Sequence, residues 1–249
     1  MQRIRTRLIR VESTHYGNMS NLIYLPDLIK QAKPLFFKLL EKADNLEHKY
    51  LNYYGDDDIR AEVFERQVQL NVWALIGFDD FLEVMKDTNG KVTRYIQLAQ
   101  QGRAIFISGY ETTNRTTYCI QAMFSIENCL AMITERPGLQ NETYTKIVSQ
   151  LQQELGVTEH QQKILLAPAY FRNSLHNNGY HARGDEFDLT MGKEAVHFKK
   201  GDMVTGFNVI TVYHIFNELY DVLGLIFETN EVKSQPLIPH NSLTYHDIQ

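Results

Sequence analysis

The chain has 249 residues, of which 43% are hydrophobic and 22% charged, a composition typical of a globular protein that buries its own core. The 30 acidic residues outnumber the 25 basic ones and give a net charge of −5. This balance excludes a bulk-basic nucleic-acid coat protein but leaves room for a local basic site. The length favours one large domain, or one domain with an extension.

The sequence favours a soluble, cytoplasmic protein. Residues 1–10 carry four arginines without an apolar stretch, so no secretory signal is expected. The apolar-leaning stretch 203–216 is interrupted by Thr, Asn and His, which argues against a membrane span. Cys119 and Cys129 lie ten residues apart in one predicted helix. That spacing is about 15 Å of helix rise, so we expect two free thiols in a reducing compartment.

The N-terminal part begins with residues 3–11, which partly alternate basic and apolar side chains and predict an edge strand or a loose arm. Residues 25–54 have helical spacing, and Pro34 is predicted to break or kink that helix. Asp56–Asp58 predict a solvated cap at the start of a second helix, 59–86. Its lone tryptophan, Trp73, is expected in the core or at an interface. Its buried stripe is predicted as Val68, Val72, Leu75 and Ile76.

A turn at 87–90 separates this part from a long helical pattern that ends at Thr134. Residues 141–155 predict a polar helix, and Thr158 caps another helix that ends at 177–179. The long helix has a buried stripe of Cys119, Met123, Ile126, Leu130 and Ile133. The later helix has an apolar side of Ile164, Leu165, Pro168, Phe171 and Leu175.

Alternating side chains at 187–198 then predict a small antiparallel β element of two or three strands. Residues 209–227 predict the last strong helix, and the tail from Glu231 is expected to be irregular. Its buried residues are predicted as Val209, Val212, Tyr213, Phe216, Leu219, Tyr220, Leu223 and Phe227.

Together, these predicted segments indicate an all-α helical bundle with a small β-hairpin insertion at about 185–205. Residues 1–90 are predicted to form an N-terminal helical extension packed on the core, residues 91–230 the helical domain, and residues 231–249 an irregular tail.

One segment, residues 171–181, concentrates an arginine, two histidines and three asparagines at the end of a helix. Arg172 and His176 are four residues apart and share one helical face. A guanidinium beside an imidazole suits an anion between them, because Arg offers a fork of donors to a phosphate and His transfers protons near neutral pH. Asn173 can orient the phosphate or the ring, and Lys199 and Lys200 can add phosphate contacts. The structural alternative is an ordinary helix stop in which His176 caps carbonyls.

Arg172-Asn173-Ser174-Leu175-His176, late in a bundle helix, resembles the signature of the HEPN (higher eukaryotes and prokaryotes nucleotide-binding) superfamily. The resemblance covers roughly residues 92–228, including the long helix that contains Glu127. It departs from the family in spacing, because three residues separate Arg172 from His176 where the family usually has four to six. Eight residues separate Arg172 from His181, which also misses the family spacing, so the alternatives are that His181 is the working histidine or that neither histidine works.

The resemblance implies an all-α domain, here HEPN-like, that dimerises with the signature helices of two subunits facing each other across a cleft. It implies that Arg172 holds the scissile phosphate of RNA, that Asn173 fills the polar position after the arginine, and that His176 is the general acid or base. The predicted catalytic residues are thus Arg172, Asn173 and His176. The predicted substrate-binding residues are Asn177, His181, Glu127, Lys199 and Lys200.

The function expected from the resemblance is RNA binding with metal-independent RNA cleavage, of the toxin, antiphage or RNA-processing type. No cofactor and no metal are expected. The expected partners are RNA (a tRNA or another structured RNA), a second copy of the chain, and an antitoxin or other protein; no membrane is expected. The alternatives are a catalytically inactive HEPN-like interaction or RNA-binding module, and a structural subunit of a defence or regulatory assembly that docks through the N-terminal extension.

Overall fold

The computed structural model describes residues 20–86, 100–134, 144–177, 179–182, 184–192 and 194–239. The predicted arm at 3–11, the turn at 87–90 and residues 240–249 lie outside these ranges. The elements are α1 (Ser20–Tyr54), α2 (Ile59–Lys86), α4 (Gln100–Ile133), α5 (Tyr144–Leu155), α6 (Glu159–Leu175), β1 (Phe187–Met191), β2 (Glu194–Phe198), α7 (Val209–Phe227) and α8 (Asn230–Lys233).

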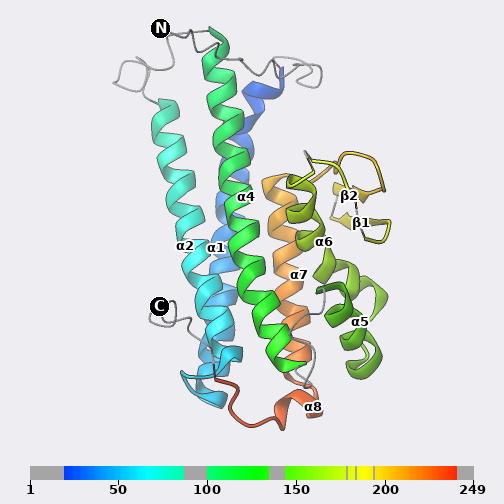
Figure 1. Ribbon diagram of the computed structural model, residues 1–249. Coiled ribbons are helices and arrows are strands. Elements are labelled where there is room, and N and C mark those ends of the chain that lie inside the picture. The colour runs from blue at the N-terminus through cyan, green and yellow to red at the C-terminus, as the bar shows by residue number, and fades with distance from the viewer. Residues whose placement is uncertain are drawn as a thin grey trace, which may run out of the picture.

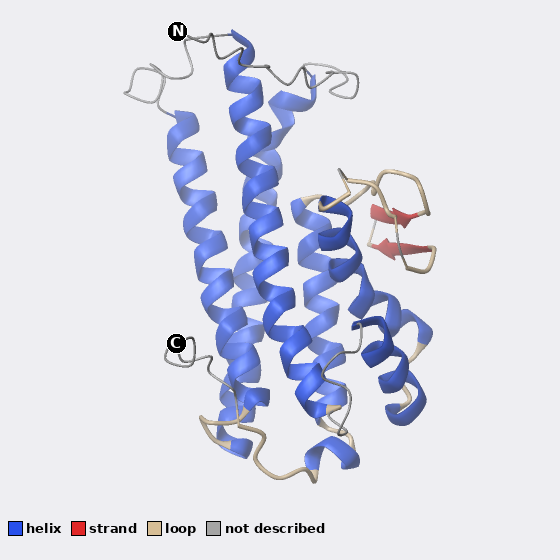
Figure 2. Ribbon diagram, in the orientation of Figure 1, coloured by secondary structure: helices blue, strands red, loops and turns tan. Residues whose placement is uncertain are grey.

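Long helices α1, α2, α4 and α7 run side by side, and α5, α6 and the hairpin lie on one side of them (Figure 1). Figure 2 shows how small the strand content is beside the helices. The prediction of a helical bundle with one small β element is therefore confirmed for the described part of the chain.

Helices α4 and α7 form the centre of the core. The five predicted stripe residues of α4 are all buried, and so are the eight predicted for α7. Helix α7 is also long and apolar enough to cross a membrane, but 61% of its apolar window is buried inside the bundle. Burial of this kind fits the core helix of a soluble protein. The same core cluster contains residues from α1 and α2, so the described parts of 1–90 and 91–230 share one core.

Helix α1 continues through Pro34, so of the predicted break or kink the break does not occur. Pro34 lies on the exposed side, while Ala32 and Phe36 on either side of it are buried. Packing of this buried face against α2 and α7 outweighs the backbone hydrogen bond that the proline cannot donate.

Helix α2 is rotated relative to the prediction. Leu75 is buried as expected, but Val72 and Ile76 are exposed, and Trp73 is 69% exposed and outside the core. The polar residues Gln67 and Asn71 take the buried positions instead.

A buried hydrogen-bond network explains this rotation. Tyr118 donates to Asn71 Oδ1 (2.9 Å), Asn71 Nδ2 donates to the hydroxyl of Tyr220 (3.1 Å), and that hydroxyl donates to Gln67 Oε1 (3.2 Å). Gln67 Nε2 donates to Ser125 Oγ at 2.8 Å. Because every member has partners from another helix, the amides can be buried without the usual desolvation penalty.

The start of α2 also differs from the prediction. Asp58 does cap the helix, since its Oδ1 accepts the backbone N–H of Arg60 (2.9 Å). It is not solvated, however, because both Asp58 and Arg60 are fully buried and form an ion pair. Arg60 also donates to the carbonyls of Val232 (2.8 Å) and Pro236 (3.2 Å), and thereby holds the C-terminal segment. That segment opens with the short helix α8 rather than being irregular throughout.

Strands β1 and β2 form an antiparallel hairpin in which Phe187 pairs with Phe198 and Met191 with Glu194. The inward residues of β1 alternate with exposed ones. Gly206 lets the chain pass closely under β2 on its way to α7: its φ is +80°, and a Cβ there would lie 1.9 Å from the carbonyl oxygen of Ala195. The hairpin also packs on α6, where the ring of Tyr170 contacts those of Phe187 and Phe198.

Candidate functional site

Helix α6 carries the predicted signature on its last turn. Thr158 begins the helix with a capping box that it shares with Gln161. The helix ends at Leu175, but His176 keeps helical backbone angles (φ −69°, ψ −15°). The four-residue spacing therefore still places Arg172 and His176 on one face, with Cβ atoms about 5–6 Å apart.

Arg172 is held by a carboxylate from the neighbouring helix α4. Its Nη1 lies 2.7 Å from Glu127 Oε2, and each of the two side chains is 22% exposed. Its Nη2 donates to the side-chain oxygen of Asn173 at 3.4 Å. The ion pair fixes the direction of the guanidinium and neutralises one edge of it, while the Nη2 edge lies beside the exposed Asn173.

The two carboxylate oxygens of Glu127 have different surroundings. Its Oε1 is buried and has no hydrogen-bond partner within the described residues. Tyr144, at the start of α5, is partly buried and donates to the carbonyl of Leu165 (3.3 Å). Burial raises the pKa of Tyr144 well above its usual value; the Glu127 carboxylate adds to this rise and the Arg172 guanidinium opposes it. The tyrosine therefore stays neutral and contributes no charge to the pair.

His176 and Asn177 lie exposed where α6 stops. The carbonyl of Ser174 accepts the backbone N–H groups of Asn177 and Gly179, both at 2.8 Å, and Gly179 has a φ of +89°. Asn177 Nδ2 donates to the carbonyl of Asn173 at 3.0 Å. The stop is thus built by backbone groups and an asparagine side chain, and within the described residues no hydrogen bond uses the His176 ring. The ring is open to solvent.

The turn that carries Lys199 and Lys200 packs beside this stop. The N–H of His181 donates to the carbonyl of Asp202, and the N–H of Gly201 donates to the carbonyl of His181, both at 2.8 Å. Both lysines are exposed. The structure therefore brings the two lysines close to His181, five residues after His176, and the backbone N–H of Lys200 donates to the carboxylate of Glu186 (3.0 Å).

His181 does not join the exposed cluster. It is 1% exposed, its Nε2 lies 3.0 Å from the carbonyl oxygen of Asp185, and its ring packs against Tyr170 and Phe198. Of the two candidate histidines, His176 is accessible and His181 is part of the core beneath the hairpin.

Two neighbours of the site were missed in the sequence. The guanidinium of Arg115 on α4 lies 5.4 Å from the ring centroid of Phe171, the residue before Arg172. Tyr144 lies near the Arg172–Glu127 pair through the packing of α5 against α4 and α6. Neither has a local sequence signal, because both contacts join segments far apart in the chain.

Over the described ranges, no three His, Cys, Asp or Glu side chains cluster as a metal site would need.

Comparison of the chain with protein-family models, with curated proteins and with solved structures finds no match.

Proposed function

We propose that this protein is a cytoplasmic, HEPN-like RNA-binding protein that cleaves RNA without a metal ion at the exposed end of α6. The observation that carries the proposal is the alignment of Arg172 and His176 on one face, with the guanidinium oriented by Glu127 and the imidazole open to solvent. An oriented fork of donors beside a free proton-transfer group suits attack at a phosphodiester.

The chemistry follows from these groups. The 2′-hydroxyl oxygen of a ribose attacks the adjacent phosphorus, and the bond from phosphorus to the 5′-oxygen of the next nucleotide breaks. His176 takes the proton of the 2′-hydroxyl or supplies the proton that the 5′-oxygen needs, with water completing the other transfer. Arg172 stabilises the charge that develops on the phosphate oxygens. The products are a 2′,3′-cyclic phosphate and a 5′-hydroxyl.

RNA binding is assigned to the polar groups around this pair. Asn173 and Asn177 present amides at the end of α6, and Lys199 and Lys200 supply two positive charges from the adjacent turn. Since the chain carries a net charge of −5, phosphate binding must depend on this small cluster rather than on a broad basic surface. We therefore propose a structured RNA, such as a tRNA, as the substrate, and a homodimer as the working form.

The second candidate is a catalytically inactive RNA-binding or protein-interaction module. The Arg172–Glu127 ion pair favours it, because a guanidinium that is already paired with a carboxylate stabilises less additional negative charge. The short spacing between Arg172 and His176 favours it as well. A toxin or antiphage system, with an antitoxin or a larger assembly as partner, is the setting that either candidate would serve.

His176→Ala is expected to lower the rate of RNA cleavage in EDTA by about 10²-fold, because the proton-transfer group is lost. The measurement is the decay of total RNA, followed over time for wild type and variant. His160→Ala is the matched control, since His160 is an exposed histidine at the opposite end of the same helix and pairs with Glu218. Equal cleavage by the wild type and both variants would remove His176 from the mechanism.

A further inference from the structure

Tyr180 presents an aromatic ring to solvent just after the exposed end of α6, where it is 45% exposed. Its backbone N–H donates to the carbonyl of Asn177 at 3.1 Å and closes a turn that starts one residue after His176. The Cα atoms at the two ends of such a turn lie less than about 7 Å apart. Tyr180 therefore belongs to the surface around the proposed RNA site, although the chemistry assigned to Arg172 and His176 does not use it.

Two backbone hydrogen bonds hold Tyr180 in a fixed place. The N–H of Val204 donates to the carbonyl of Gly179 (2.9 Å), and the N–H of His181 donates to the carbonyl of Asp202 (2.8 Å). They pair Tyr180 with Met203 in an antiparallel bridge. Because both bonds flank the pair instead of joining it, the two Cα atoms are about 4.5 Å apart and the two side chains share one face.

The side chain of Met203 thus lies next to the ring of Tyr180, and Met203 is 43% exposed. The following residue, His181, is buried, as expected where successive side chains point to opposite faces. A thioether beside an aromatic ring makes a favourable contact and restricts the motion of the ring. We call Tyr180 and Met203 the aromatic platform.

The aromatic platform is connected to cations as well as to the end of α6. The N–H of Gly201 donates to the carbonyl of His181 (2.8 Å), and the N–H of Asp202 donates to the carbonyl of Lys199 (2.9 Å). The exposed Lys199 and Lys200 therefore immediately precede the segment that pairs with Tyr180. Cations for the phosphates beside an exposed ring for the bases are the combination that binds single-stranded nucleic acid.

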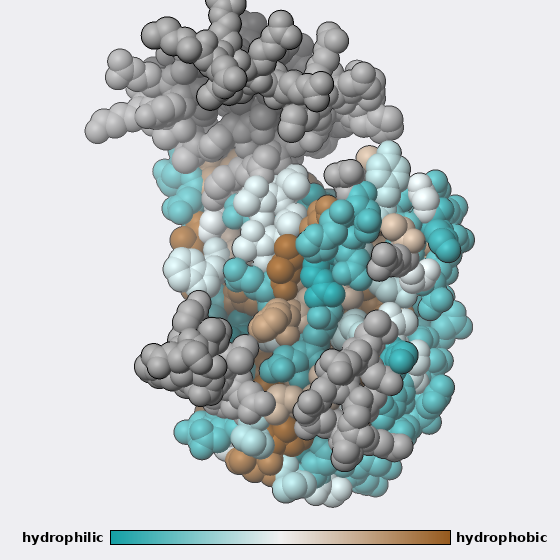
Figure 3. All heavy atoms as spheres, in the orientation of Figure 1, coloured by the Kyte–Doolittle hydropathy of each residue, from teal (hydrophilic) through white to brown (hydrophobic). Residues whose placement is uncertain are grey.

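The surroundings of the aromatic platform favour RNA over a protein partner. Figure 3 shows a mainly hydrophilic surface over the hairpin and the neighbouring end of α6, with only small pale and tan areas. Protein-binding sites are instead marked by contiguous apolar patches. Stacking also draws on no charge, which suits RNA binding by a chain whose net charge is −5.

From these observations we infer that the ring of Tyr180, supported by Met203, stacks on the RNA base next to the phosphate held by Arg172. The site then requires an unpaired nucleotide at this position, such as one in a loop of a structured RNA, because a base inside a duplex offers no free face. This inference rests on the RNA binding proposed above and not on cleavage.

The test is the affinity of the full chain for a short, fluorescein-labelled 2′-O-methyl oligoribonucleotide, measured by fluorescence anisotropy. This probe lacks the 2′-hydroxyl and stays whole. Tyr180→Ala should weaken binding of the single strand by about 10- to 100-fold, whereas Tyr180→Phe should keep it within about threefold, because the ring remains. Tyr53→Ala is the matched control, since Tyr53 is a 57% exposed tyrosine on α1. Circular dichroism checks that each variant is folded.

The same probe annealed to its complement tests the requirement for an unpaired base. The wild type should bind this duplex more weakly than the single strand, and Tyr180→Ala should bind it as the wild type does. Salt provides a second check on the single strand. Binding as a whole should weaken as salt rises, but the ratio of wild-type to Tyr180→Ala affinity should stay constant, because stacking is not screened.

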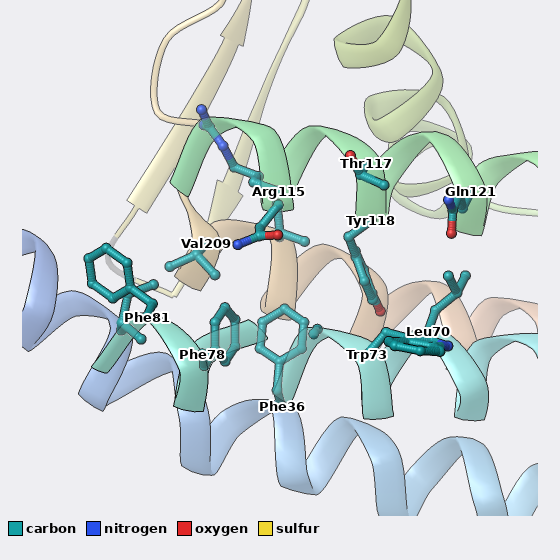
Figure 4. Close-up of a pocket in the computed structure, with 14 residues that line it drawn as sticks. Phe36, Leu70, Trp73, Phe78, Phe81, Arg115, Thr117, Tyr118, Gln121 and Val209 are labelled. Carbon is teal, nitrogen blue, oxygen red and sulfur yellow. The ribbon is translucent and has the colours of Figure 1, made fainter. Parts of the chain in front are cut away.

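Fluorescence reports stacking directly, because Trp73 is the only tryptophan in the chain. It lies at a cavity of about 90 Å³ between α2 and α4, with Phe36 and Phe78 (Figure 4), and not on α6 or the hairpin. In the double variant Trp73→Phe, Tyr180→Trp the one indole replaces the ring of Tyr180. The single-stranded probe should change its emission strongly, and should leave the emission of the wild type unchanged.

The outcomes separate this inference from the proposed function. If the wild type binds the single strand and folded Tyr180→Ala binds it equally well, the inference is overturned and the proposed function stands. A loss for Tyr180→Phe as large as that for Tyr180→Ala, or a double variant whose emission does not change when the probe binds, would also overturn the inference. A wild type that binds neither form of the probe would overturn both.

Discussion

Arg172→Ala is expected to lower the rate of RNA cleavage by about 10³-fold, because the donors that stabilise the charged phosphate are removed. Arg172→Lys is expected to restore little of this loss, since an ammonium group cannot offer two parallel donors or keep the fixed direction of a guanidinium. The measurement is the single-turnover rate on RNA in EDTA, which separates the chemical step from product release.

Arg172→Ala also leaves the carboxylate of Glu127 without its ion pair, so a loss of folding must be distinguished from a loss of chemistry. The double variant Arg172→Ala, Glu127→Gln removes the unpaired charge and should fold like the wild type while remaining inactive. Lys163→Ala is the control, because it removes a cation from the same helix at its pair with Glu159. If folded Arg172→Ala cleaves RNA at the wild-type rate, the site lies elsewhere.

Arg60→Met is expected to lower the free energy of unfolding by about 3–5 kcal/mol, the range for breaking a buried pair by removing one partner. Arg60 Nε lies 2.7 Å from Asp58 Oδ1, and its guanidinium stacks 3.5 Å from the ring centroid of Tyr54. The substitution leaves Asp58 charged and buried, and it frees the carbonyls of Val232 and Pro236. Urea unfolding followed by circular dichroism measures the loss.

Two further variants distinguish the effect of breaking the buried Asp58–Arg60 pair from the effect of removing any one charge. Lys49→Met breaks an exposed ion pair with Glu228 and should cost less than about 1 kcal/mol. The double variant Asp58→Asn, Arg60→Met should lose less than the sum of its single variants, because the unpaired charge is gone. A loss of under about 1 kcal/mol for Arg60→Met would show that the buried pair contributes little to stability.

The sequence correctly predicted the helices and strands that pack through a regular stripe of apolar side chains. The stripes of α4 and α7 follow a regular helical period and are buried as expected. The hairpin was recognisable from the alternation at Phe187, Leu189 and Met191. In these segments local periodicity and burial agree, so no knowledge of the neighbouring helices was needed.

The predictions that were wrong concern residues whose partners lie far along the chain. Gln67 and Asn71 are buried because Tyr118 and Tyr220 meet them, and Asp58 is buried because the segment near Pro236 covers Arg60. Such partners are invisible to a local pattern. The rotation of α2 that results from them is what exposes Trp73.

The candidate site was predictable only in part. The common face of Arg172 and His176 follows from spacing alone, whereas the ion pair with Glu127 joins residues 45 positions apart. The accessibility of the two histidines depends on the hairpin, which packs over His181 and leaves His176 in solvent. Tertiary packing, not sequence spacing, therefore decides which of the two candidate histidines is accessible to solvent.

The most direct test of the proposed function is the chemistry of the RNA ends left by purified protein in EDTA. The account predicts fragments that carry 2′,3′-cyclic phosphates and 5′-hydroxyls with the wild type, and intact RNA with Arg172→Ala and His176→Ala. RNA that is bound but left whole by the wild type would support the inactive module instead. RNA that all three proteins leave equally intact and unbound would contradict the account.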